Sequence, residues 1–170
     1  MEAKTKPIKR NPNLVPLSRE HHFGLLFCWK IKQGLALEAD PKVIRNYVQY
    51  FWDKNLLHHF QEEEELLLTI LSDEDSLKKQ VLEEHRQIRN LVDELIKDKA
   101  IEIIKLEKLK DSLKSHIRFE EREFFPNLEQ KATAAQLTQI GKLLAKDAIE
   151  PEDNFEPEFW VKQKHSCGGR

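Results

Sequence analysis

Two stretches of the chain place a histidine and a glutamate four residues apart. The first is HFQEE, from His59 to Glu63, and the second is HIRFEEREFFP, which starts at His116 and has Glu120 at the equivalent place. Residues four apart lie on one face of an α-helix, so each stretch presents an imidazole beside a carboxylate. Two such pairs that face each other offer ligands to two metal ions. The sequence therefore predicts a dinuclear metal site.

Two further helices are expected to carry a histidine on their buried side. His85 lies in the middle of an otherwise apolar seam of the third helix. On the first helix two adjacent histidines compete. His21 is four residues from both Leu17 and Leu25, whereas His22 belongs to a competing face. Helical phase favours His21 as the inward residue, and His22 stays as the alternative.

These residues would place two carboxylates and four imidazoles in one layer of the core. A buried ionised carboxylate is costly without a partner, and a pair of divalent or trivalent cations supplies the compensation. Mixed nitrogen and oxygen ligands suit iron or manganese and also accept zinc. A single buried histidine is more often an ordinary core residue, so a metal-free helical bundle is the competing interpretation. The repeat in register, with histidines on two further helices, favours the metal site.

The composition indicates a soluble helical protein with a cytoplasmic location. Charged residues make up 34% of the 170 residues and only five are glycine, which predicts few, long elements and argues against a β-rich fold. The net charge of −2 gives no reason to expect nucleic acid or an anionic membrane as a partner. No apolar run approaches the roughly 20 residues that span a bilayer. Cys28 and Cys167 do not suggest a disulfide framework, and Cys28 is expected in the core.

Capping signals and apolar periodicity predict four long helices and a short fifth one. The first helix is expected to start near Ser18, with Ser18 as its N-cap, and the third to be capped by Ser72-Asp73. The fourth follows a turn near residues 97–101, and Pro126 comes soon after its last apolar position. The second helix is expected to run from Pro41 to about Leu71, with Asp40 as its N-cap. The short fifth helix is expected to run from Ala134 to about Lys146, with Thr133 as its N-cap. The inward stripe of the second helix is expected to continue from Glu63 through Leu66 and Ile70.

The chain divides into an N-terminal arm (1–13), a helical domain (14–148) and a C-terminal tail (149–170). The tail mixes acids, prolines and aromatics, and it is expected to be irregular unless Phe155, Phe159 and Trp160 dock it. The acidic run Glu62–Glu65 includes Glu63, which belongs to the predicted metal site. The other three residues of the run, Glu62, Glu64 and Glu65, are expected to lie on a solvated charged face. Phe124-Phe125 is interpreted as plain core.

Four motifs occur in a particular order, and together they resemble a known family. They are SREHHFGL (18–25), HFQEE (59–63), EEHRQIRNL (83–91) and HIRFEEREFFP (116–126). Over about residues 14–128 the chain resembles the hemerythrin-like, or HHE cation-binding, domain. The resemblance implies an all-α fold, an antiparallel up-down four-helix bundle, with two non-heme iron ions bridged by two glutamates. The ligands it implies are His21 (or His22), His59, Glu63, His85, His116 and Glu120.

The chain departs from the oxygen-carrying members of that family at two places. Those members have a second histidine one turn after the third-helix ligand, where this chain has Arg89, and they space the last pair by five, which would use Glu121. The spacing of four, to Glu120, looks like the bacterial and regulatory branch. Six ligands would leave open positions on the metals.

The resemblance implies a protein that binds or processes oxygen, nitric oxide or peroxide in sensing or in a stress response. No separate acid–base group stands out, so the sequence does not identify an enzyme. The alternative is a regulatory iron or oxygen sensor without turnover, with a protein partner at the C-terminal tail.

Overall fold

The computed structural model describes residues 8–163, and within that range every regular element is helical. The helices that consist of one α-helical segment are α1 (Val15–Ala36), α4 (Ser76–Lys97) and α7 (Ala134–Lys146). None of the described helices is long and apolar enough to cross a membrane. Cys167 lies outside the described residues.

The second and fourth long helices are built from several segments each. Between Pro41 and Ile70 the order is α2 (Pro41–Phe51), η1 (Trp52–Leu56), α3 (Leu57–Glu62), η2 (Glu63–Leu67) and η3 (Leu68–Ile70). Between Ile103 and Lys131 the order is α5 (Ile103–Phe119), η4 (Glu120–Phe124) and α6 (Phe125–Lys131). The segments η1, η2 and η4 are π-helical turns, and η3 is a 3₁₀ turn.

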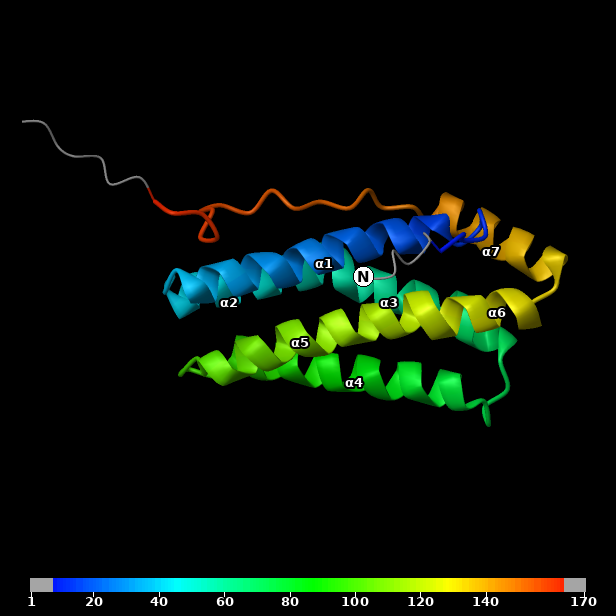
Figure 1. Ribbon diagram of the computed structural model, residues 1–170, viewed down its shortest axis with the longest axis horizontal. Coiled ribbons are helices and arrows are strands. Elements are labelled where there is room, and N and C mark those ends of the chain that lie inside the picture. The colour runs from blue at the N-terminus through cyan, green and yellow to red at the C-terminus, as the bar shows by residue number, and fades with distance from the viewer. Residues whose placement is uncertain (1–7, 164–170) are drawn as a thin grey trace, which may run out of the picture.

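The long helices run up and down beside one another and form an antiparallel bundle, with α7 lying beyond one end of α1 (Figure 1). Helix α1 packs on α5, and α5 packs on α4. The predicted all-α bundle with an extra C-terminal helix is therefore confirmed. The division into arm, domain and tail at residues 13 and 148 stays a prediction.

The π turns are local widenings of the helix that periodicity did not predict. In each, a backbone N–H donates to the carbonyl five residues earlier, as Leu68 does to Glu63 and Phe125 does to Glu120. Two of the three π turns therefore begin at the glutamates of the predicted site, and such turns often mark functional positions. The helix also continues past Pro126, because a proline in the first turn of a new α-helical segment leaves no N–H unpaired.

Two predicted N-caps are wrong. Helix α1 begins at Val15, and Ser18 lies inside it, where the Ser18 hydroxyl donates to Glu121 Oε1 at 2.7 Å. Helix α4 is capped by Asp75 instead of Ser72-Asp73, because the Asp75 carboxylate accepts from the first backbone N–H groups of α4. The caps expected at Asp40 and Thr133 are confirmed, and Thr133 forms a capping box with Gln136.

The core consists of two apolar clusters with a polar layer between them. One cluster includes Phe27, Phe51 and Leu109, and the other includes Leu17 and Phe124. The buried polar side chains that separate the two clusters are His21, His59, Glu63, His85, His116 and Glu120. Cys28 is in the first cluster, as predicted.

Candidate metal centre

The structure brings all six residues of the predicted ligand set into one buried cluster. His21 comes from α1, His59 from α3, His85 from α4 and His116 from α5, and none of the six is more than 4% exposed. Glu63 and Glu120 are the first residues of the π turns η2 and η4. Two groups with donor atoms within 4.8 Å of one another result, and both glutamates belong to both groups. They are His21, His59, Glu63 and Glu120, and Glu63, His85, His116 and Glu120.

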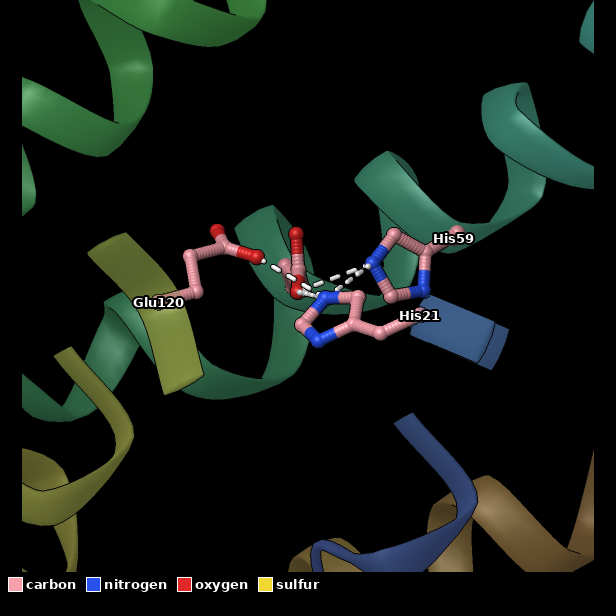
Figure 2. A group of neighbouring side chains, drawn as sticks. His21, His59 and Glu120 are labelled. Carbon is pink, nitrogen blue, oxygen red and sulfur yellow. Dashed lines mark hydrogen bonds and ion pairs between the residues drawn. The ribbon is translucent and has the colours of Figure 1, made fainter. Parts of the chain in front are cut away.

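The first group is arranged around two imidazole Nε2 atoms that face each other. His21 Nε2 and His59 Nε2 are 3.1 Å apart. His59 Nε2 lies 3.1 Å from Glu63 Oε1, and His21 Nε2 lies 3.0 Å from Glu120 Oε2. Figure 2 shows the two rings and Glu120 converging from three different helical elements.

The second group repeats this geometry on the other side of the two carboxylates. His85 Nε2 and His116 Nε2 are 3.1 Å apart, His116 Nε2 lies 3.1 Å from Glu120 Oε1, and His85 Nε2 lies 3.1 Å from Glu63 Oε2. Each glutamate therefore turns one oxygen toward each histidine pair. This is the arrangement that a carboxylate needs to bridge two ions.

Each of the four imidazoles also makes a hydrogen bond through its outer nitrogen. The four Nδ1 atoms lie 2.6 to 2.7 Å from a second set of carboxylates. The pairs are His21–Glu121, His59–Glu20, His85–Glu64 and His116–Glu84. An Nδ1–H that donates to a carboxylate fixes the tautomer and directs the Nε2 lone pair inward, as metal-ligating histidines require.

Sequence reasoning missed this outer set of carboxylates. Glu64 was expected on a solvated face, but it accepts from His85 and from Arg89 Nη1, each at 2.7 Å. The expectation for Glu62 was also wrong, because its side chain is buried beside His58. Burial, and then the nearby charge of Glu20, raise the pKa of Glu62 to about 7. Glu65 is exposed, as expected.

A signal for the outer carboxylates was present in the sequence. Each of them is the immediate neighbour of one of the six inner residues, as Glu20 is of His21 and Glu121 is of Glu120. Neighbouring residues on a helix point about 100° apart. The acid therefore reaches a histidine on an adjacent helix, while its neighbour points into the core.

Arginines support two of the four outer carboxylates. Arg10, from the segment before α1, donates to Glu121 Oε2 at 2.8 Å and to Glu129 Oε1 at 3.0 Å. Arg89 supports Glu64 in the same way. Each histidine pair thus has one imidazole whose carboxylate partner contacts a guanidinium group.

The two remaining histidines of the described range stay outside the cluster. His22 is exposed on α1 and belongs to neither group of possible ligands. His58 is partly exposed and lies 3.0 Å from Glu62 Oε1. Of the two histidines that the sequence left open on the first helix, the structure brings His21 to the cluster.

The electrostatics of the cluster show how strongly it attracts positive charge. Burial lowers the pKa of His59, but Glu63 and Glu20 outweigh burial and raise that pKa to about 9. Burial opposes the charged form of Glu63, yet the surrounding histidines hold its pKa well below the usual range. Without a metal, protons on the imidazoles must supply the positive charge that the carboxylates require.

The donor atoms fit two metal ions. Within residues 8–163, no oxygen of Glu63 or Glu120 accepts a hydrogen bond, although both side chains are fully buried. Ligands bound to one ion at about 2.1 Å lie about 3 Å apart when they are adjacent, which matches the contacts between Nε2 and carboxylate oxygens. Six carboxylates surround the four imidazoles, and Arg10 and Arg89 offset only part of their negative charge, so two divalent cations would offset most of the remainder.

A small cavity opens against the histidines. It has a volume of about 20 Å³, and its lining includes His21, His59 and His116 together with the apolar side chains of Phe51 and Leu113. A cavity needs about 10–15 Å³ on this measure to hold one water molecule. The cavity therefore has room for a molecule of about two heavy atoms beside the cluster.

The comparison with protein families agrees with this geometry. A model of the hemerythrin HHE cation-binding domain matches residues 20–128, the range that contains all six inner residues. No curated protein and no solved structure matches the chain. Arg10, α7 and residues 149–163 lie outside the matched range.

Proposed function

The chain belongs to the hemerythrin HHE cation-binding family, and on that basis we propose that the buried cluster holds two non-heme iron ions. The ions would serve to bind or process oxygen, nitric oxide or peroxide, in sensing or in a stress response. The observation that carries the proposal is the pair of buried glutamates, each with one oxygen toward each histidine pair and neither oxygen hydrogen-bonded by any residue that the structure describes.

Each ion would have its own pair of imidazoles and would share both carboxylates. His21 and His59 would hold one ion, and His85 and His116 the other, with Glu63 and Glu120 as bridges. Nitrogen and oxygen donors in this mixture suit iron, and also accept manganese or zinc. Four donors per ion leave open positions for an exogenous ligand.

The residues around the cavity determine what can reach those positions. Phe51, Leu113 and Ile117 are almost fully buried and form the apolar part of the cavity wall, which also includes Lys54 and Asn55. The apolar part favours small neutral molecules over hydrated ions. Bound iron would supply reversible electron transfer and the open coordination positions. The outer carboxylates would hold the imidazoles in the tautomer that keeps Nε2 free for metal.

A second function, iron or oxygen sensing without turnover, is supported by the position of the polar layer. The six inner residues separate the two apolar clusters of the core. Loss of the metal would leave buried charges between those clusters, so metal occupancy would be coupled to the packing of the whole bundle.

Metal analysis of anaerobically purified protein tests the proposal, combined with an optical spectrum before and after exposure to air. We expect two irons per chain and a new charge-transfer band after air or nitric oxide is added. Two zinc ions would keep the site but remove its redox chemistry. A protein that holds no metal after iron is supplied would contradict the proposal.

A further inference from the structure

Beyond α7 the chain returns along the bundle in an extended conformation. Residues 149–160, which we call the C-terminal strap, run beside α1 toward the turn between α1 and α2 (Figure 1). This segment lies outside the range that matches the family model. Its contacts with the bundle are specific and polar as well as apolar.

The first anchor of the strap is a backbone clamp on the π turn η1. Asn55 Nδ2 donates to the Glu152 carbonyl at 2.7 Å, and the Glu152 N–H donates to Asn55 Oδ1 at 3.0 Å. The Tyr50 hydroxyl accepts from the Asn154 N–H at 3.0 Å. One asparagine side chain therefore pairs with the strap as a neighbouring strand would.

The second anchor is a buried ion pair. Asp153 Oδ2 lies 2.9 Å from Lys30 Nζ and accepts from the Tyr47 hydroxyl at 2.7 Å. Lys30 is only 6% exposed, and its ammonium group lies 3.9 Å from the centre of the Trp160 ring. A lysine that depends on Asp153 for its charge partner holds the strap firmly.

Between these anchors and α7, the strap passes beside the cavity at the cluster. Ile149 and Pro151 contribute to the lining of that cavity. The same two residues, together with Glu20, also line an outer groove of about 60 Å³ that reaches Glu62 and Leu144. Ile149 and Pro151 therefore line both the inner cavity and a larger groove at the surface.

We propose that the C-terminal strap determines which ligands reach the centre, with Ile149 and Pro151 as the size-limiting wall and Asn55 as the residue that positions it. This inference rests on the proposed function, because the cavity opens onto the histidines that would hold the ions. While the strap is closed, the cavity admits molecules of about two heavy atoms. Once residues 149–151 move outward, the cavity and the outer groove join and larger molecules can enter.

Two variants of the full chain test the proposal. Asn55→Asp keeps the size of the side chain but removes its donor to the Glu152 carbonyl, and Pro151→Gly removes the ring from the wall and adds chain freedom. Asn90→Asp is the matched control, because it makes the same charge change on an exposed position of α4. One readout is the rate of nitric oxide binding to iron-loaded protein. The other is labelling of His59 in metal-free protein by a small neutral diazirine activated by light, which does not require a deprotonated imidazole, mapped by mass spectrometry.

We expect both rates to rise about fivefold in Asn55→Asp, as the loss of one net hydrogen bond across the strap would produce. Both rates should also rise in Pro151→Gly, because the wall is smaller, and should not change in Asn90→Asp. Unchanged labelling of His59 in both variants would overturn the proposal. If the wild type takes up no metal, the proposed function fails on its own, and labelling of His59 still decides whether the strap controls access.

Discussion

The outer nitrogens of the four buried histidines do not all have equivalent partners. Glu121 and Glu64 contact Arg10 and Arg89, whereas within residues 8–163 no arginine or lysine pairs with Glu20 or Glu84. A guanidinium group makes a charge-assisted hydrogen bond that fixes the position of the carboxylate. Each proposed ion would thus have one imidazole whose outer carboxylate is held by an arginine and one whose outer carboxylate is not.

At this scale, Arg10→Gln tests whether the arm before α1 supports the metal centre. The variant leaves Glu121 without its charge partner, so the orientation of His21 loosens, and the affinity for metal should fall about tenfold, as for other outer partners of metal ligands. Competition with a chromophoric chelator measures the affinity. Arg122→Gln is the control, because Arg122 is exposed and next to the same glutamate. Equal affinities in the two variants would contradict the role of Arg10.

A second residue-scale prediction separates the two adjacent histidines of α1. His21→Ala removes an imidazole from the first ligand group, so bound metal should fall by at least one ion per chain. His22→Ala should keep the full metal content, because His22 is exposed and outside both groups. Elemental analysis of the two purified variants gives the result. Metal loss in His22→Ala alone would show that the ligand assignment is reversed.

The inner residues were accessible from the sequence, whereas the pairing of each outer carboxylate with a particular histidine was not. Spacing identifies His59 with Glu63 and His116 with Glu120, because both members of each pair lie on one helix. The outer pairs join different helices, as Glu20 and His59 do. A helix rich in glutamate offers an acid near every histidine, and only the rotation of the neighbouring helix decides which acid is used.

The elements that hold the site depend on two features, π turns and a close helix contact. After the π turn at Glu63, the buried residues are Leu67, Leu68 and Leu71, whereas unbroken periodicity predicted Leu66 and Ile70. One extra residue in the turn moves the stripe by one position. No residue type marks a π turn, so the sequence could locate the helix but not this change of phase.

The close contact between α1 and α5 gives a prediction at the scale of elements. A Cβ atom on Gly24 would lie 2.7 Å from Ile117 Cδ1, so Gly24→Ala should lower the free energy of unfolding by about 1 kcal/mol through overpacking. Ile117→Val removes that Cδ1 atom, and its Cγ1 position is 3.9 Å away. Chemical denaturation of the single and double variants should therefore show rescue in Gly24→Ala/Ile117→Val. An equal loss in the double variant would exclude this contact as the cause.

At the scale of the whole molecule, a charged layer divides the core in two. The metal-free protein must keep that layer neutral with protons on histidines such as His59, whose pKa is raised to about 9. A raised histidine pKa adds stability that is complete below the unfolded value of 6.5 and is lost as the pH rises through about 9. The lowered pKa of Glu63 adds stability above its unfolded value of 4.5, which is lost in acid.

Metal removal should therefore change the pH dependence of stability. We expect the urea midpoint of metal-stripped protein to be highest between about pH 5 and 6.5 and to fall steadily toward pH 9.5. The metal-loaded protein should keep its midpoint over the same alkaline range, because the ions replace the protons. Parallel pH profiles for the two forms would argue against a charge layer that the metal neutralises.

The central claim is that two ions lie between two histidine pairs and share both glutamates. Anomalous diffraction from crystals of the metal-loaded protein, recorded on both sides of the metal absorption edge, tests it most directly. We expect two peaks per chain, one beside His21 and His59 and the other beside His85 and His116, with Glu63 and Glu120 between them. A single peak, or none in this layer of the bundle, would contradict the account.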